Sequence, residues 1–340
     1  MELKQQLVLI LGALCLILPS GCEPLPCSSC SEESGWHRVT LGLGDGGIVT
    51  KTAGVTPESE TAIQSCRLYV FTGEGTSLTG SWTDRDGVFD LYLPDGTYDF
   101  FVVANKDGLP VSGFTFEALK HVPVFLSDNE PGRFVMTGAL SGHEVKQDEE
   151  LLVDVSRTVA KVSCCIRQDL RGKLADSSFE VEEVFMTNVA GENDLGLTWT
   201  APPVDGRWYN PMDYTPAAGL DLPDAMLHCE PGRMLARGDS LVLGDVFYVF
   251  PNAVETDSHD RDAWSPRCTR LVVAARLEGV RVYYAVTIPR VQPNRHYHID
   301  LTIRNRGMEH PEDDPKGYVP AVVSITTDDW HDGGTVRHVF

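Results

Sequence analysis

Arg270 to Pro289 reads Arg-Leu-Val-Val-Ala-Ala-Arg-Leu-Glu-Gly-Val-Arg-Val-Tyr-Tyr-Ala-Val-Thr-Ile-Pro, and Asn294 to Ile303 reads Asn-Arg-His-Tyr-His-Ile-Asp-Leu-Thr-Ile. These residues form three short runs rich in Val, Ile, Tyr and Thr. The runs are separated by Glu278-Gly279 and by a stretch that begins at Pro289. β-branched and aromatic runs between turn residues are typical of strands joined by tight turns. The stretch therefore predicts a β-rich fold.

The last of these runs shows which side of its strand is buried. His296, His298 and Asp300 alternate with apolar residues at 297, 299 and 301. Side chains alternate between the two faces of a strand, so this spacing predicts one polar face and one apolar face.

The same pattern extends along the chain and suits two domains, because 340 residues exceed one typical domain. We expect an N-terminal β-sandwich over residues 36–155 and a C-terminal one over 156–340. No helix with strong 3.6-residue periodicity is expected. The remaining predicted strands are Val39 to Leu43, Cys66 to Phe71, Val88 to Leu93, Tyr98 to Ala104, His121 to Leu126, Gly132 to Thr137, Leu151 to Ile166, Phe179 to Asn188, Leu241 to Phe250, Tyr318 to Thr326 and Thr335 to Phe340.

The charge balance excludes some partners. The formal net charge is −21, and binding to phosphates needs clustered Lys and Arg. We therefore expect no nucleic-acid partner and no binding to an anionic membrane through protein charge.

The first 21 residues have the layout of an export signal. Lys4 precedes an apolar run, and Ser20-Gly21-Cys22 follows it. This ending resembles a bacterial lipobox, so lipidation at Cys22 is expected, with an ordinary secretory cleavage and a plain thiol as the alternative. Lipid chains would hold the protein on a membrane. Residues 22–35, which are small, polar and Pro-rich, are predicted to be a tether.

The cysteine count argues against a disulfide framework. Nine cysteines are present, and removing Cys15 with the signal and Cys22 with the lipid leaves an odd seven. Cys27-x-x-Cys30 matches a redox or zinc half-site, but no second pair lies at zinc-finger spacing. Adjacent Cys164 and Cys165 point to opposite faces of their strand and are predicted to be packing residues.

Motifs of enzyme chemistry are missing from the sequence: it contains no G-x-S-x-G elbow, no P-loop and no H-E-x-x-H. We therefore expect no catalytic residues, no cofactor and no metal. Three patterns leave a metal alternative open, each beside a commoner interpretation as a turn, a solvated loop or an exposed strand face. They are Asp84-x-Asp86, the loop with Asp257, His259, Asp260 and Asp262, and His296-x-His298.

Residues 201–233 form a long Pro-rich insertion that holds Trp208 and Tyr209. Long loops are often functional. The two rings could stack on a sugar in a ligand loop, or they could cap the edge of the sandwich, which we favour because Trp and Tyr bury well there.

Several strand-and-turn motifs, taken in order, carry a resemblance to a known family. They are the lipobox-like start, Cys66-Arg67-Leu68-Tyr69-Val70-Phe71, Leu91-Tyr92-Leu93-Pro94-Asp95-Gly96-Thr97-Tyr98-Asp99, Tyr248-Val249-Phe250-Pro251-Asn252, Tyr283-Tyr284-Ala285-Val286-Thr287-Ile288, Asn294-Arg295-His296-Tyr297 and Asp329-Trp330. Together they resemble the fimbrillin superfamily of Bacteroidales, whose members are subunits of type V pili.

This resemblance implies two transthyretin-like β-sandwich domains and assembly by donor-strand exchange. In that family a trypsin-like protease removes an N-terminal strand, and a strand of another subunit fills the vacated groove. On this chain the removable strand would hold Val39, Leu41 and Leu43, with Arg38 or Lys51 as possible cleavage sites. The donor strand, Thr335 to Phe340, would carry Val336, His338 and Phe340 on one face.

We therefore expect a non-catalytic stalk, tip or anchor subunit of an adhesive fimbria at the outer membrane. Its partners would be other fimbrial subunits, the membrane through the N-terminal lipid, and a host protein or glycan. The alternative is a surface lipoprotein that binds glycan through Trp208 and Tyr209. A zinc hydrolase that uses His296 and His298 is a third hypothesis.

Overall fold

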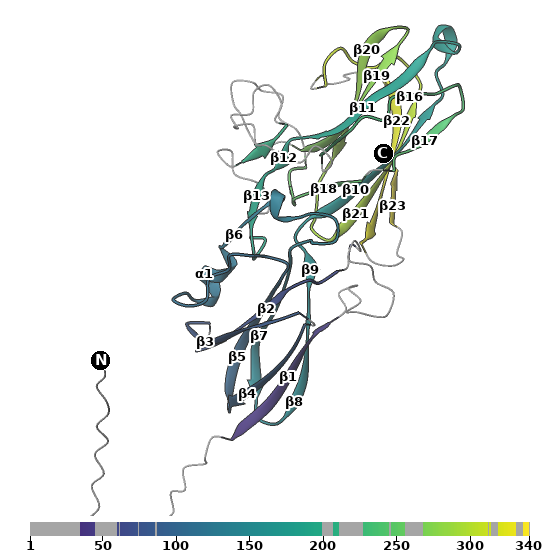
Figure 1. Cartoon of the computed structure of the whole chain (residues 1–340). Helices are drawn as coiled ribbons and strands as arrows, with labels where there is room; N and C mark the ends of the chain where they lie inside the picture. The colour runs from purple at the N-terminus through teal and green to yellow at the C-terminus, as the bar shows by residue number, and fades with distance from the viewer. Residues whose placement is uncertain are drawn as a thin grey trace, which may run out of the picture.

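The structure is a computed structural model, and it describes residues 35–44, 60, 62–73, 75–85, 87–198, 207–210, 227–244, 246–255, 268–311, 313, 319–330 and 336–339. Within these ranges the regular secondary structure is almost entirely β-strand (Figure 1), as the sequence predicts. The α-helix α1 (Phe116–Lys120) is five residues long. No helix in the described part of the chain has the length and apolar character needed to cross a membrane.

The first half of the chain forms two sheets with an apolar core between them. One sheet has the strand order β4-β1-β8, and the other has the order β3-β2-β5-β7-β9. In β4, every second residue is buried, so one face of the small sheet packs inward. The strands are β1 (Trp36–Gly44), β2 (Cys66–Thr72), β3 (Ser77–Asp84), β4 (Val88–Pro94), β5 (Gly96–Ala104), β7 (Met136–Val145), β8 (Glu149–Asp154) and β9 (Ser156–Arg157).

The second half also forms two sheets. One has the order β17-β10-β21-β22-β23, with β18 also paired to β10, and the other has the order β15-β11-β19-β20, with β16 also paired to β11. The strands are β10 (Ala160–Gln168), β11 (Phe179–Thr187), β15 (His228–Cys229), β16 (Arg233–Met234), β17 (Ser240–Val242), β18 (Phe247–Val249), β19 (Thr269–Leu277), β20 (Val280–Ile288), β21 (Arg295–Ile303), β22 (Ala321–Asp329) and β23 (Val336–Val339).

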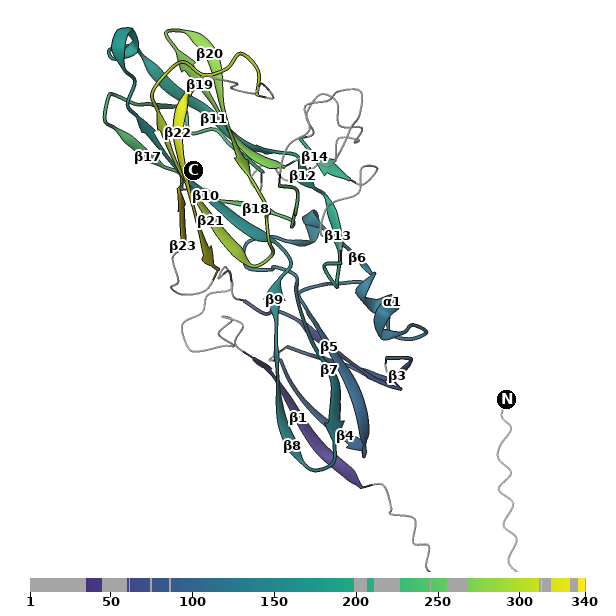
Figure 2. The same ribbon diagram turned by 180° about the vertical axis from the view of Figure 1, so that it is seen from behind.

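The two halves lie along one long axis, with β1 near one end and β20 near the other (Figures 1 and 2). The chain changes sheets after Arg157, because β9 still pairs with β7 while β10 begins the second group. This change lies close to the boundary expected after residue 155, and separate folding of the two domains stays a prediction. One short pair, β13 (Glu192–Asp194) with β6 (Pro123–Phe125), joins the two halves. A second short pair, β12 (Val189–Ala190) with β14 (Trp208–Tyr209), lies within the second half.

The stretch that predicted the fold forms β19, β20 and β21, as expected. Glu278 and Gly279 have positive φ values of 50° and 81°, as a tight hairpin turn between twisted strands requires. In β21, Tyr297, Ile299 and Leu301 are at most 4% exposed. The predicted apolar face is therefore the buried one.

Three local expectations differ from the structure. The run from Leu151 to Ile166 is broken into β8, β9 and β10. The strand β3 was not predicted, because its sequence Ser-Leu-Thr-Gly-Ser-Trp-Thr-Asp is largely polar, as suits an edge strand. Helix α1 was also missed, and its Phe116 packs edge-on against Phe71 of β2 and Phe101 of β5.

Candidate strand-exchange sites and the junction between them

β1 occupies the middle of its sheet and is paired along both edges (Figure 1). It runs antiparallel to β4, from Trp36 opposite Pro94 to Gly42 opposite Val88. It also runs parallel to β8, where Leu41 lies opposite Leu151. Removing β1 would therefore leave two strand edges with unpaired N–H and C=O groups.

The inward face of β1 is apolar. Val39 and Leu41 are fully buried and Leu43 is 8% exposed, so the three residues predicted for the removable strand share the core face. On the outward face, Asp90 of β4 accepts hydrogen bonds from the Thr40 hydroxyl at 2.7 Å and from Arg38 Nη2 at 3.1 Å. These two hydrogen bonds lower the pKa of Asp90, and the bond from Thr40 has the larger effect. Apolar burial and this polar rim together fix the register of the strand.

The two predicted cleavage sites differ in what a cut would release. Arg38 lies inside β1, where its backbone N–H donates to Asp148 Oδ1 at 2.8 Å. A cut after Arg38 would leave Val39 to Gly44 attached to the rest of the chain. Lys51 lies outside the described residues and is the only Lys or Arg between Arg38 and Arg67, so a cut after Lys51 would separate all of β1.

β23 contrasts with β1, because it is an edge strand paired on one side. It runs antiparallel to β22, with Val336 opposite Thr327 and His338 opposite Ile325. The predicted donor strand is thus a strand near the C-terminus, while Phe340 lies outside the described residues.

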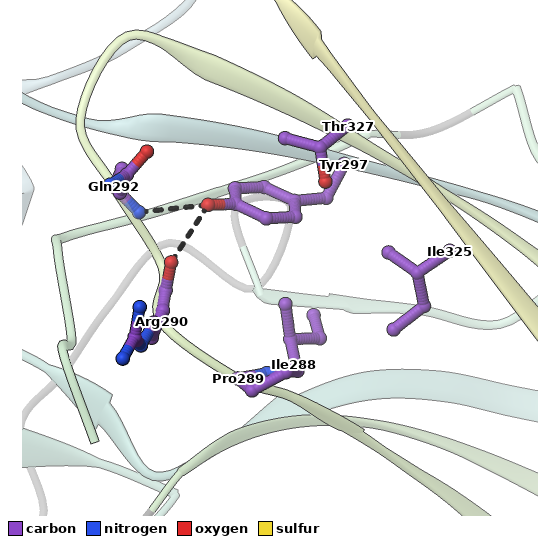
Figure 3. A pocket seen from close by; sticks show the side chains of 7 residues that line it. All are labelled: Ile288, Pro289, Arg290, Gln292, Tyr297, Ile325 and Thr327. Carbon is purple, nitrogen blue, oxygen red and sulfur yellow. Dashed lines mark hydrogen bonds between the residues drawn. The ribbon is translucent and has the colours of Figure 1, made fainter. Parts of the chain in front are cut away.

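A cavity of about 290 Å³ lies beside the part of β22 that pairs with β23 (Figure 3). Ile325 and Thr327 of β22 line it together with Tyr297 of β21 and Ile288 at the end of β20. The Tyr297 hydroxyl accepts from the backbone N–H of Gln292 at 2.9 Å and donates to the carbonyl of Arg290 at 3.0 Å. These bonds hold the turn that forms one wall of the cavity.

Glu60 joins the two halves of the chain. Its carboxylate accepts hydrogen bonds from Lys161 Nζ at 2.7 Å, from the Tyr248 hydroxyl at 2.7 Å and from Trp330 Nε1 at 2.8 Å. Burial alone would raise the pKa of Glu60, but the hydrogen bonds from Lys161, Trp330 and Tyr248 outweigh it and lower that pKa. The carboxylate is therefore held in its charged form.

An aromatic stack continues the junction. Trp330 stacks on Tyr248 with ring centroids 5.6 Å apart, and Phe134 meets Trp330 edge-on at 5.3 Å. The buried Arg157 guanidinium lies 4.4 Å above the Trp330 ring, and its Nε donates to the Glu60 carbonyl at 2.9 Å. Sequence reasoning identified Trp330 only as a family motif and missed Glu60, whose partners are distant along the chain.

Trp208 and Tyr209 are not placed as a sugar platform. Trp208 is fully buried and Tyr209 is 6% exposed, and both belong to β14, which pairs with β12. A stacked sugar needs an exposed ring face. The burial contradicts the ligand-loop interpretation of these two rings and agrees with edge capping.

His296 and His298 lie side by side on β21, and the Ser163 hydroxyl is 2.7 Å from His296 Nε2 and 2.8 Å from His298 Nδ1. Burial, with the nearby charge of Lys161, lowers the pKa of His296. Among the described residues, the grouping with metal-ligand spacing is instead Glu183, His228 and Glu230. Arg281 Nη2 already neutralises Glu183 at 2.8 Å, so this grouping has an internal counter-ion.

Several of the remaining predicted sites lie outside the described residues. They are Cys22, Cys27, Cys30, Asp86, Asp257, His259, Asp260 and Asp262. Within the described ranges, Cys66, Cys164 and Cys165 are free thiols. Cys164 is buried and Cys165 is partly exposed, as expected for neighbours on opposite faces of β10. Burial raises the pKa of Cys66 to about 12, so this thiol is protonated and unreactive at neutral pH.

Comparisons by sequence find no matching family model and no matching curated protein. Comparison by structure finds similar folds. A putative cell adhesion protein from Bacteroides eggerthii has a TM-score of 0.62 and 16% identity, covering 86% of this chain and 96% of that one. A fimbrilin (FimA) from Porphyromonas gingivalis W83 has a TM-score of 0.59 and 17% identity, covering 87% and 98%.

A third similar structure is the tip fimbrial protein Mfa3 from Porphyromonas gingivalis with a C-terminal truncation. Its TM-score is 0.55 and its identity 14%, covering 87% of this chain and all of that one. The likeness extends over nearly the whole length of each protein. The chain therefore has the fold of these fimbrial and cell adhesion proteins.

Proposed function

We propose that this protein is a structural subunit of a fimbria, that it supports adhesion, and that it is assembled by donor-strand exchange without catalytic activity. The observation that carries the proposal is β1, a strand with its own buried apolar row, paired on both edges and followed by a stretch with a single lysine. The shared fold with the fimbrilin FimA and the tip fimbrial protein Mfa3 supports it.

The physical logic of exchange follows from the β1 site. A chain without β1 has an apolar slot between β4 and β8 and two rows of unpaired backbone groups, and a strand from another subunit satisfies both. Backbone pairing supplies affinity, and the pockets that held Val39, Leu41 and Leu43 select the register. β23 is the proposed donor because it has one paired edge in the sheet.

The N-terminal lipid belongs to the same proposal. Export as a lipoprotein acylated at Cys22 would place the protein at the outer membrane surface before assembly. An anchor subunit would retain both the lipid and β1. A stalk or tip subunit would lose both after cleavage at Lys51.

The first test is the N-terminal state of the protein taken from its native outer membrane, by intact mass and N-terminal sequencing. An N-terminus after Lys51 supports cleavage-triggered exchange, and a lipidated Cys22 with β1 attached supports the anchor role. An N-terminus after Arg38 would contradict the removal of β1, since Val39 to Gly44 would remain.

The second test is assembly in vitro. Protein cut after Lys51 is freed of its N-terminal fragment and mixed with a peptide of residues 36–44, or with the matched peptide that carries Leu41→Lys. We expect the first peptide to bind and block polymerisation and the second to do neither, because a charge cannot enter the slot of Leu41. Deletion of residues 335–340 should abolish polymerisation, and unchanged polymers would refute the donor assignment.

A further inference from the structure

The basic side chains of this acidic protein differ in whether they form ion pairs. Most described Lys and Arg residues form ion pairs, as Arg38 does with Asp90 and Arg276 with Glu182. Arg167 and Arg237 are among the basic residues that have no such partner in the described part of the chain, and these two lie close to Asp169. Arg167 lies opposite Ser240 of β17, and β17 belongs to the half of the molecule away from β1 (Figure 1).

Two neighbouring strands bring these groups together. β10 and β21 are parallel, and Arg167 lies directly opposite Thr302. Asp169 follows Arg167 by two residues and Arg304 follows Thr302 by two, so strand alternation places all four on the same outward face. Gln168 and Ile303, which lie between them, are buried on the other face.

A cavity of about 310 Å³ lies among Arg167, Asp169, Thr302, Arg304 and Gly238. This volume is at the lower end of the roughly 300–1,000 Å³ of small-molecule sites. Gly238 has φ +89° and open space at its Cβ position, so no side chain from this turn fills the cavity.

The polar groups of this cavity are incompletely satisfied. Arg171 Nη2 donates to Asp169 Oδ2 at 2.6 Å. Arg304 Nε lies 3.4 Å from the same oxygen but is shielded from solvent and makes no hydrogen bond. One carboxylate thus faces more than one guanidinium, and positive charge is left over.

We infer that this cavity, which we call the distal basic pocket, binds an acidic sugar through Arg167, Arg304 and Thr302. The guanidinium groups match a carboxylate or sulfate ester with paired N–H donors. Asp169 supplies an acceptor for sugar hydroxyls, and it disfavours a bare anion that has no hydroxyl groups. The lining holds no apolar side chain, which fits a sugar edge better than an acidic peptide with its apolar stems.

The binding chemistry predicts weak, salt-sensitive contacts. Exposed ion pairs are screened by salt, and the pocket offers no aromatic ring for stacking. In a fimbria, repetition of the subunit would raise the avidity without a new contact. That gain rests on the proposed function, whereas binding by the single chain does not.

The test uses the purified chain, with galacturonate and galactose 6-sulfate as probes and galactose and inorganic phosphate as matched controls. Binding is followed by amide chemical shifts in NMR at low and high salt. We expect both acidic sugars to bind and to shift resonances at Arg167 and Thr302, with galactose and phosphate at least about tenfold weaker, the worth of one charge-assisted hydrogen bond.

Arg167→Ala should weaken acidic-sugar binding by about tenfold or more, whereas Arg233→Ala, which removes an exposed arginine on β16, should leave it unchanged. Both variants should keep the wild-type melting temperature. Equal binding by the two variants, equal binding of galactose, or no binding of either acidic sugar would each overturn the inference. Preferential binding of a poly-glutamate peptide would also overturn it, in favour of a protein partner. Because these measurements use the monomer, they are independent of polymerisation.

Discussion

β1 and β23 are the first and the last strands of the described chain, yet they are held in opposite ways. β1 is central in its sheet, paired on both sides, and carries fully buried Val39 and Leu41. β23 is four residues long, lies at a sheet edge and, among the described strands, pairs with β22 alone. A strand buried on one face and paired on both edges stabilises the fold that contains it, whereas an edge strand can leave at smaller cost. The difference fits the proposed roles, in which β1 leaves a slot and β23 fills one.

Removal of β1 is expected to have the largest effect. Each fully buried Val or Leu stabilises a fold by about 1.5–3 kcal/mol, and the ladder to β4 and β8 is lost as well. Protein that lacks residues up to 51 should melt far below the intact chain, and addition of a peptide of residues 36–44 should restore much of the loss. A thermal melt with and without peptide measures both. An unchanged melting temperature would end the assignment of β1 as a structural strand.

A smaller change in the same strand should give a graded loss. Leu41→Ala should lower the free energy of unfolding by about 2–5 kcal/mol, because it leaves a cavity in a closed core. Leu152→Ala is the matched control on the neighbouring β8, where Leu152 is 71% exposed, and it should change stability by less than about 0.5 kcal/mol. Urea denaturation compares them, and equal losses would mean that the face assignment of β1 is wrong.

A substitution of Glu60 measures how much the contacts between the two halves of the chain contribute to stability. Glu60 lies between β1 and β2, and its hydrogen-bond partner Trp330 lies between β22 and β23. Glu60→Gln removes the charge but keeps the shape, and should lower the free energy of unfolding by about 1–2 kcal/mol at neutral pH.

The effect of Glu60 should depend on pH in a defined direction. Its pKa in the folded protein is below the ordinary value of 4.5, so its charge stabilises the fold at pH values above 4.5. That contribution is lost as pH falls through the lowered pKa. The stability difference between wild type and Glu60→Gln should therefore be constant from pH 7 to 5 and shrink in more acidic buffer. A difference that grows on acidification would contradict the hydrogen-bonded carboxylate.

Deletion of residues 335–340 should have the smallest effect on stability. The loss of one edge ladder should shift the melting temperature by no more than about 2–4 °C. Hydrogen exchange should show faster exchange of those amides between Ser324 and Thr327 that point to β23, whereas the alternate amides, which point to β21, should stay protected. Slow exchange there, or a drop as large as that for β1, would break the contrast between the two strands.

How much of the structure can be predicted from the sequence depends on how far apart along the chain the interacting residues lie. The strands β19, β20 and β21 were predicted because alternation and the Glu278-Gly279 turn are local signals. β3 was missed because an edge strand needs few apolar residues, and α1 because its Phe116 is buried by tertiary contacts with Phe71 and Phe101.

The sites divide in the same way. The row of Val39, Leu41 and Leu43 was predicted from its spacing and lies on the core face. The partners of Glu60 are 101 to 270 residues away along the chain, and no local sequence pattern predicts contacts at such separations. The pairing of Arg167 with Thr302 likewise depends on the parallel register of β10 and β21.

The double ladder around β1 also has a mechanical consequence. Inter-strand hydrogen bonds of an antiparallel pair lie perpendicular to the strand axis, so tension along that axis loads the β4 ladder in shear and shares the force among all its bonds. The parallel β8 ladder, bonded along the opposite edge, shares the same load. A four-residue strand held on one edge by β22 can instead be peeled one bond at a time. In a fimbria pulled by flow, a strand seated in the β1 slot would thus resist extraction far better than β23 resists detachment from its own subunit.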